Sequence, residues 1–436
     1  MHLKDSLSGE LLPVKPSFVS IYACGITPYS SAHVGHARTY VVFDLLANVL
    51  RAEGHSVHLV RNITDIDDKI IAVANKEGVT WRDISTKYAD ENRALMQATG
   101  LTVPDEPKAS DYLEDIFWIT QALITKDLAY VSSTGDVLYR VSAYAGQLLM
   151  NHKAGTLRSE QGETRVNQAG KEDLRDFALW KRVPDTEPGF ASPWGHGRPG
   201  WHIECSAMIK SLFGGSVTIH GGGVDLKFPH HQAEIMQSEP VFGAALADIW
   251  MHNGSVLSDG KKMSKSLNNF VTWQAALTTA EALVPGLGAD LLRISLLQAH
   301  WQKPLDWSDK LLFTTKTDLL QLTQGLEQVP ATNNQAFMAQ LRTNLNFPSA
   351  MVKLKQQRKQ GNLGGVVAAL EFLGVNVSAW ASFKEQKLQG ALTDAEIKDL
   401  LAQREQARQD KNWARADELR DLIQQSGVHL KDTKAK

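Results

Sequence analysis

The most constraining feature of this 436-residue sequence is an opening pattern of strand, turn, helix and strand. The apolar run Phe18–Ala23 indicates a buried strand, and Gly25 opens a turn-forming stretch after it. A helix is predicted from His36, because apolar residues from Tyr40 to Leu50 follow helical spacing and Gly54 comes after the last of them. Val57–Ile63 indicates a second strand. This order is typical of parallel sheets that bind nucleotides at the carboxyl ends of their strands.

The remainder of the chain divides by composition and periodicity. Residues 83–130 are predicted to be helical, and the Gly- and Pro-rich residues 150–200 to be an irregular insertion. A second α/β stretch is expected from Pro199 to about His300, and beyond Asp306 the spacing of Leu and Ala indicates helices only. We therefore predict an α/β fold with a Rossmann-like parallel-sheet catalytic domain and an all-α C-terminal region. The expected parts are a catalytic domain at 1–305 with an insertion at about 95–200, a helical domain at 306–392, and a small C-terminal module at 393–436.

Composition narrows the class of protein. With 43% hydrophobic and 22% charged residues, the chain is neither disordered nor collagen-like, and its net charge of −2 provides no overall attraction for nucleic acid. An RNA partner would need a local patch. Residues 334–392, with seven basic and two acidic side chains, form either such a patch or a solvated helix face.

Neither a membrane segment nor a secretion signal is expected. The most apolar stretch, Gly364–Ala381, contains Glu371 and Asn376 and is predicted to be a buried amphipathic helix. The N-terminus lacks a continuous apolar run, and a content of only two cysteines, Cys24 and Cys205, fits a reducing compartment. The sequence therefore predicts a cytoplasmic protein with no membrane partner.

A histidine pair stands where the first strand meets the first helix. His33-Val34-Gly35-His36 would place two imidazoles and an approachable backbone at a helix N-terminus, where N–H groups and the helix dipole favour phosphate. By itself, the motif is more typical of two surface histidines in a turn.

A lysine-rich stretch follows about 225 residues later. Lys261-Lys262-Met263-Ser264-Lys265-Ser266 can form a mobile loop that neutralises a leaving pyrophosphate, or a solvated basic loop. The two motifs together, in this order, are far more specific than either alone. They resemble the signature of the class I aminoacyl-tRNA synthetases.

Four potential metal ligands are scattered along the chain. Cys24 ends the first predicted strand, Cys205 follows Trp201-His202-Ile203-Glu204, and His230 and Glu234 are spaced to share one face of a helix. Two thiolates, an imidazole and a carboxylate make a suitable tetrahedral Zn²⁺ set. The alternative is two buried thiols and a surface His/Glu pair. His231 is a further candidate ligand, although its side chain is expected to point elsewhere on the helix.

Longer motifs make the resemblance closer. The chain resembles the cysteinyl-tRNA synthetases over about residues 18–310, and again over Arg404–Gly427, which is similar to the small C-terminal module of that family. The matching stretches are Tyr22–Thr27, His33–His36, Arg61–Lys69, Gly197–Ser206, His220–Leu226, Phe228–His231 and Lys262–Ser266.

The resemblance implies a monomeric enzyme that activates L-cysteine with Mg²⁺-ATP and transfers it to the 3′ end of tRNA(Cys), with one Zn²⁺ per chain selecting the substrate thiol. It implies catalytic roles for His33, His36, Lys262 and Lys265. The implied ATP and adenylate contacts are Thr39, Gly223, Asp225, Val256 and Lys265. The implied amino-acid contacts are Gly25, Thr27, Asn62, Thr64 and Trp201. The implied zinc ligands are Cys24, Cys205, His230 and Glu234.

Three departures from the family pattern keep other functions open. Leu267-Asn268-Asn269 stands in place of Leu-Gly-Asn, the acidic run of the helical domain is reduced, and the usual Gly-Thr-x-Trp tail is missing. One rival is the related mycothiol-pathway ligase, which joins cysteine to an amino sugar–inositol but lacks the module matched at Arg404–Gly427. The others are an inactive RNA-binding paralogue, which would not need the retained motif residues, and an unrelated H-x-G-H nucleotidylyltransferase, which would not explain the zinc set.

Overall fold

The computed structural model describes residues 1–146, 149, 170–258, 260–263, 269–388, 394–410 and 412–425. By their contacts, the residues cluster into two compact units. The first comprises Met1–Ala276, Leu296–Asp306 and Gln335–Lys353, and the second comprises Leu277–Ser295, Trp307–Asn334 and Leu354–Lys436.

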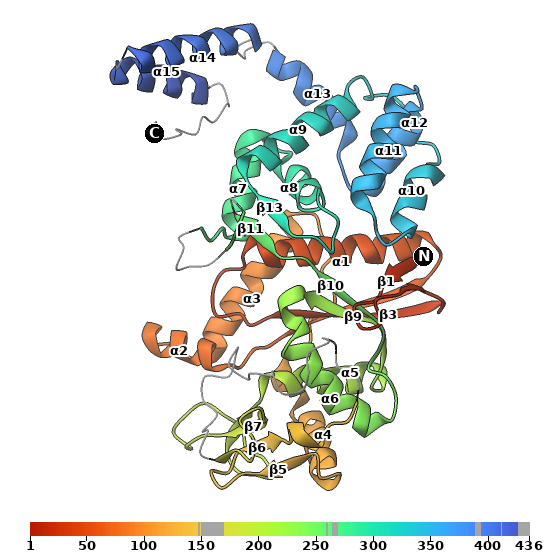
Figure 1. Cartoon of the computed structure of the whole chain (residues 1–436), viewed down its shortest axis with the longest axis vertical. Coiled ribbons are helices and arrows are strands. Elements are labelled where there is room, and N and C mark those ends of the chain that lie inside the picture. Colours follow the sequence, from red (N-terminus) through yellow and green to blue (C-terminus); the bar gives the residue numbers. More distant parts are fainter. Residues whose placement is uncertain are drawn as a thin grey trace. The chain divides into compact units, whose positions relative to one another are not determined.

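A four-stranded parallel sheet forms the centre of the first unit (Figure 1). Its strand order is β10-β9-β3-β4, with Ile21 of β3 aligned with Leu59 of β4 and Tyr22 aligned with His220 of β9. The strands are β3 (Phe18–Ile26), β4 (Ser56–Ile63), β9 (Val217–Gly223) and β10 (Ala247–Asn253). The predicted Rossmann-like parallel-sheet fold is therefore confirmed, and the first predicted strand and helix are both present.

Helices cover both faces of this sheet (Figure 1). One face carries α1 (Val34–Ala52), and the other carries α5 (Trp201–Phe213) and α6 (His230–Phe242). His33 caps the N-terminus of α1, because its side chain accepts hydrogen bonds from the N–H groups of Gly35 and His36. Gly214, with a φ of 75°, ends α5 in the left-handed conformation that glycine adopts without strain.

Between β4 and α5 the chain forms a separate antiparallel sheet of order β5-β6-β7-β8. Its strands are β5 (Ala129–Val131), β6 (Val137–Tyr139), β7 (Phe177–Arg182) and β8 (Gly197–Pro199), and the helices before it are α2 (Asp68–Glu77), α3 (Trp81–Ala98) and α4 (Leu113–Thr125). The expectation of irregular structure throughout 150–200 is wrong at β7 and β8. There the four apolar residues Phe177–Trp180 are buried, and Phe177, Leu179 and Trp180 pack into one core with α4.

Smaller elements complete the first unit. The strands β1 (His2–Lys4) and β2 (Leu11–Pro13) form a hairpin. Three further strands are β11 (Val256–Ser258), β12 (Lys261–Lys262) and β13 (Leu305–Trp307), of which β13 runs into the second unit. The helix α10 (Gln335–Arg342) and the first part of α11 (Phe347–Lys359) also belong to the first unit. The helix α7 (Trp273–Leu283) begins in this unit and ends in the second.

The second unit is helical, as the spacing of Leu and Ala predicts. Besides the ends of α7 and α11 it contains α8 (Gly288–Leu296), α9 (Asp309–Thr323), α12 (Leu363–Phe372), α13 (Val377–Leu388), α14 (Asp394–Gln409) and α15 (Trp413–Gln425). The single amphipathic helix expected at Gly364–Ala381 is instead two helices, because Gly374 adopts a φ of 74° and interrupts the helical backbone.

Within the described residues, no single helix has the length and apolarity needed to cross a membrane. Only Leu363–Phe372 and Val377–Phe383 taken together pass such a test, and the two are bent by 110°.

Candidate active site and metal centre

The candidate site lies at the carboxyl ends of the parallel strands, where such sheets bind ligands. Cys24 and Gly25 stand near the end of β3, Asn62 near the end of β4, and Gly223 at the end of β9. The close approach at Gly25 requires glycine, because a Cβ there would overlap the main-chain oxygen of Asn62.

The histidine pair at the start of α1 is held by the backbone. His33 Nδ1 accepts from the N–H of Gly35 at 3.0 Å, and His36 Nδ1 accepts from the N–H of His33 at 3.2 Å. The two rings are stacked with centroids 3.8 Å apart. A ring nitrogen that accepts carries no proton, so each neutral imidazole has its proton on Nε2. Burial, and beyond it the charges of His33 and Arg61, lower the pKa of His36 well below its usual value, so His36 is a neutral donor.

The described part of the lysine motif is a short hairpin. Strand β11 pairs with β12, and Gly260 between them adopts a φ of 72°. Lys265 lies outside the described residues, as do Leu267 and Asn268 and the side chain of Lys262. The chain that returns from this motif pairs with the start of α1, through Val34 N–H to Val271 O at 3.1 Å and Trp273 N–H to Ala32 O at 2.8 Å. The structure thus places the segment that follows the lysine motif beside the start of α1.

Four of the five residues expected to contact ATP lie within the described part of the chain, all except Lys265. The Thr39 hydroxyl donates to the carbonyl oxygen of Gly35 at 3.2 Å, which holds it against the first turn of α1. Val256 is the buried first residue of β11. Asp225 is exposed on the short 3₁₀ turn Val224–Lys227 beyond β9, with a carboxylate oxygen 2.5 Å from where a Cβ of Gly223 would lie.

Three of the five expected amino-acid contacts form one hydrogen-bond chain. The N–H of Gly25 donates to Asn62 Oδ1 at 2.9 Å, and Asn62 Nδ2 donates to Thr64 Oγ1 at 3.4 Å. Thr64 Oγ1 then donates to Glu204 Oε2 at 2.8 Å. Glu204 was not predicted as a site residue, and burial raises its pKa well above the usual value. The sequence offered one signal for it: Glu204 adjoins Cys205, and its neighbours at helical spacing, Trp201, Ala207 and Met208, are apolar.

The other two expected contacts are less connected. Trp201, the first residue of α5, stacks on the imidazole of His230 with ring centroids 4.2 Å apart. Thr27 follows the end of β3, and its carbonyl oxygen accepts the N–H of Tyr29 at 2.9 Å.

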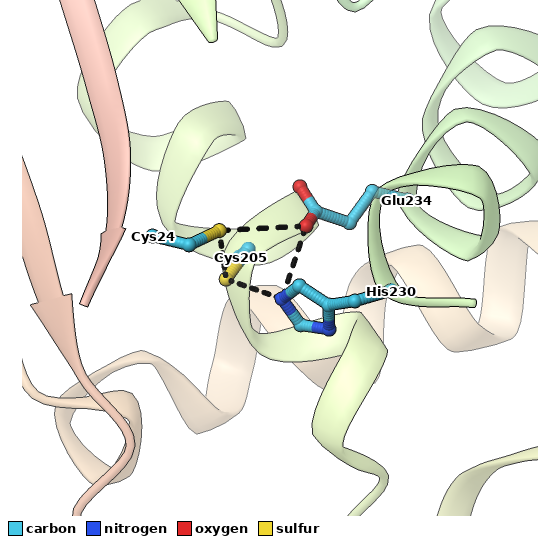
Figure 2. Close-up of side chains that lie close together, drawn as sticks. All are labelled: Cys24, Cys205, His230 and Glu234. Carbon is cyan, nitrogen blue, oxygen red and sulfur yellow. Dashed lines mark hydrogen bonds and ion pairs between the residues drawn. The ribbon is translucent and has the colours of Figure 1, made fainter. Parts of the chain in front are cut away.

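Four side chains from three elements converge on one another (Figure 2). Cys24 comes from β3, Cys205 from α5, and His230 and Glu234 from the first turns of α6, and all four are buried. Their nearest donor atoms are Cys24 Sγ and Cys205 Sγ at 3.8 Å, Cys24 Sγ and Glu234 Oε1 at 3.7 Å, Cys205 Sγ and His230 Nε2 at 3.5 Å, and His230 Nε2 and Glu234 Oε1 at 3.1 Å.

These spacings fit a tetrahedral metal ion. Zinc bonds of about 2.3 Å to sulfur and about 2.0 Å to nitrogen or oxygen would separate the ligand atoms by about 3.3–3.8 Å. Burial raises the pKa of both thiols and lowers that of His230, so burial disfavours the thiolates and the imidazolium unless a compensating charge is present. The donor set and its spacing therefore define a possible metal site.

A layer of buried histidines holds the ligands in place. His202 Nδ1 lies 2.9 Å from His230 Nδ1, which turns His230 Nε2 towards the other donors. His220 Nε2 lies 2.6 Å from Glu234 Oε2, and its Nδ1 lies 2.9 Å from the carbonyl oxygen of Tyr22. Neither role was predicted, because the spacing of these histidines in the sequence resembles no metal motif.

The expectation that His231 points elsewhere is wrong. Its Nε2 lies 3.2 Å from Cys24 Sγ, and its Nδ1 lies 2.7 Å from His252 Nε2. The donors surround the N-terminal end of α6, so two consecutive residues of that helix both border the cluster. Cys24, His220, His231 and Glu234 consequently form a second group with metal-ligand spacing.

Comparison with known proteins identifies the class. Residues 10–317 match the family model of the tRNA synthetases class I (C) catalytic domain, and residues 392–436 match that of the cysteinyl-tRNA ligase anticodon binding domain. The fold is similar to that of methionyl-tRNA synthetase of Mycobacterium tuberculosis in complex with methionyl-adenylate. The alignment covers 84% of this chain and 91% of that one, with a TM-score of 0.58 and 16% sequence identity. The fold and the two paired motifs are those of a class I aminoacyl-tRNA synthetase.

Sequence relatives narrow this further. The cysteine–tRNA ligase of Dichelobacter nodosus is 38% identical over 99% of this chain and 97% of its own length. That of Methylobacillus flagellatus is 39% identical over 97% of this chain and 94% of its own. The chain belongs to the cysteine–tRNA ligase family, as its motifs predict.

Proposed function

We propose that this enzyme activates L-cysteine with Mg²⁺-ATP and transfers it to the 3′ end of tRNA(Cys). The observation that carries the proposal is the convergence of Cys24, Cys205, His230 and Glu234, in a chain that matches cysteine–tRNA ligases over 99% of its length. The match of 392–436 to an anticodon binding domain favours tRNA as the acceptor over an amino sugar.

The four clustered side chains would hold a zinc ion at the base of the amino-acid pocket. When bound, zinc prefers a soft thiolate and lowers its pKa, which would select cysteine over serine. An apolar pocket alone separates such near-isosteres by only about 10²-fold. Gly25, Thr27, Asn62, Thr64 and Trp201 would surround the rest of the amino acid.

In the first half-reaction the cysteine carboxylate attacks the α-phosphorus of ATP, and pyrophosphate leaves with the bonding electrons. His33 and His36 would donate their Nε2–H groups to the triphosphate, and Lys262 and Lys265 would balance the charge that develops on it. Thr39, Gly223, Asp225 and Val256 would hold the nucleotide. In the second, a hydroxyl of the terminal tRNA ribose attacks the activated carbonyl and AMP leaves.

The domain roles follow the same proposal. Residues 1–305 would carry out both half-reactions, residues 306–392 would contact the tRNA, and residues 393–436 would read its anticodon. We also propose a monomer that acts in the cytoplasm. Support for that compartment comes from the content of only two cysteines, which fits a reducing environment.

The test is cysteine-dependent ATP–pyrophosphate exchange and charging of tRNA(Cys) with labelled cysteine, measured on one preparation. We expect both activities. Exchange without charging would redirect the adenylate to another acceptor, and the amino sugar–inositol would then be tried. Absence of both activities would contradict the proposal and favour an RNA-binding paralogue.

A further inference from the structure

Arg38 is a buried cation one turn into α1 from the histidine pair. Its side chain is inaccessible to solvent, and its guanidinium donates to three main-chain carbonyl oxygens. The acceptors are Gly254 O at 2.8 Å, Ser255 O at 3.1 Å and His300 O at 3.2 Å. All of these residues belong to the first unit.

A guanidinium can donate hydrogen bonds in several directions at once, which matches the three carbonyl oxygens around Arg38. Burial lowers the pKa of Arg38 to about 10, so the group remains charged at neutral pH and its hydrogen bonds are charge-assisted. The planar fork reaches acceptors on two separate segments at once. A lysine at this place would offer a compact point charge that cannot span them.

The segments that Arg38 binds lead into the lysine motif. Gly254 and Ser255 connect β10 to β11, and β11 pairs with β12, which contains Lys261 and Lys262. Further hydrogen bonds stiffen the connection: Gly254 N–H donates to Trp301 O at 2.7 Å, and Leu305 N–H donates to Ser255 O at 2.9 Å.

The far end of the lysine motif is bound to the same helix. Val271 and Trp273 pair with Val34 and Ala32 through the two backbone hydrogen bonds given above. The Phe270 ring packs edge-on against His33, with centroids 5.2 Å apart. The first two turns of α1 therefore hold both the chain that enters the lysine motif and the chain that leaves it.

We propose that Arg38 is a positioning residue for the activation step. It sets the place of the lysine-bearing hairpin relative to His33 and His36, so that both groups meet the triphosphate from fixed positions. The proposal rests on the proposed function and goes beyond it, since the Arg38 side chain is buried and donates to main-chain carbonyls. Displacing a positioned group by about 1 Å costs about 10²-fold in rate.

The test compares Arg38→Lys with Arg51→Lys, an exposed arginine in the last turn of the same helix. The readouts are kcat and the KM values for ATP and cysteine in the exchange reaction, the zinc content and the Tm. For Arg38→Lys we expect kcat to fall about 10- to 100-fold at a temperature where the protein is folded. The KM for cysteine and the zinc content stay within about twofold of wild type, because the metal cluster lies on other elements. Arg51→Lys should behave as wild type.

An unchanged kcat in folded Arg38→Lys would overturn the proposal. So would parallel loss of zinc and of cysteine binding, which would mean that the whole site collapses. Should Arg38→Lys fail to fold, Arg38→Gln keeps a planar donor and should show the same pattern of lost kcat and retained cysteine KM. Failure of both variants to fold would assign Arg38 to stability alone. Absence of exchange in the wild-type protein would instead contradict the proposed function.

Discussion

Cys24 and Cys205 are 181 residues apart in the chain, yet their sulfur atoms lie 3.8 Å apart. Cys24 lies near the carboxyl end of β3 and Cys205 in the first turns of α5, and the other two ligands are oriented by buried neighbours. The His202 ring orients His230, and the His220 ring orients Glu234. Loss of a ligand and loss of its neighbour should therefore have related effects on metal affinity.

At this scale we predict that Cys205→Ser loses the metal. A serine hydroxyl stays protonated where a thiolate would bind, so the variant retains three ligands and a weaker site. Zinc should fall from about one per chain to a small fraction of that, and discrimination of cysteine from serine should fall with it. Elemental analysis after dialysis measures the first effect, with the exposed Ser211→Ala on the same helix as the control. Full zinc occupancy in Cys205→Ser would contradict the assignment of this ligand.

Individual elements differ in how much packing holds them. Helices α5 and α6 pack with the sheet and with each other, and most of their residues are buried. The pair α14 and α15 has a much smaller core among its described side chains, formed by Ala407, Ala416 and Leu419 with Leu400 packed against them. Few apolar contacts make a helix pair easy to unfold locally.

For this pair we predict that Leu419→Ala separates the two activities. Leu419 is 1% exposed, and truncating a buried leucine costs about 2–5 kcal/mol, which is large for so small a core. Charging of tRNA(Cys) should fall at least tenfold, because the anticodon module unfolds, while cysteine-dependent exchange is retained. The control is Leu174→Ala, in which the replaced leucine is 69% exposed. Equal loss of exchange and charging in Leu419→Ala would show that the module supports the catalytic site itself.

The whole molecule has a pH dependence that its buried histidines dictate. Burial lowers the pKa of His252 to about 3, whereas an unfolded histidine titrates near 6.5. Below about pH 6.5 the unfolded chain therefore binds a proton that the native protein does not, and the stability of the native protein decreases as the pH is lowered. One such histidine costs up to about 2 kcal/mol between pH 6.5 and pH 5.

We therefore predict that His252→Gln is less sensitive to acid than the wild type. Urea unfolding of both proteins at pH 7.5, 6.5 and 5, at saturating zinc, should show a smaller loss of stability for the variant below pH 6.5. His2→Gln, at an exposed position, should follow the wild type. An equal loss of stability in the wild type and in His252→Gln between pH 6.5 and pH 5 would contradict this prediction.

The sequence by itself determined the parallel-sheet start, the helical second half and the set of expected site residues. These depend on local periodicity, on turn-forming residues and on motifs long enough to be specific. The Phe18–Ala23 run and the spacing of His230 and Glu234 are examples, since one strand or one helix turn suffices to interpret each. The strand at residues 177–182 could not be predicted in this way, because a short apolar run between turns is compatible with either irregular structure or a strand.

Only the tertiary structure decided which distant residues meet. Glu204, His202, His220 and His252 acquire their roles from contacts that join the end of β4 to α5, α5 to α6, β9 to α6, and α6 to β10. The direction of His231 depends on what surrounds the end of α6, and the role of Arg38 depends on carbonyl groups more than 200 residues away. Burial is a property of the packed sheet and its covering helices. The altered pKa values and the metal-ligand spacing that follow from burial therefore exist only in the folded chain.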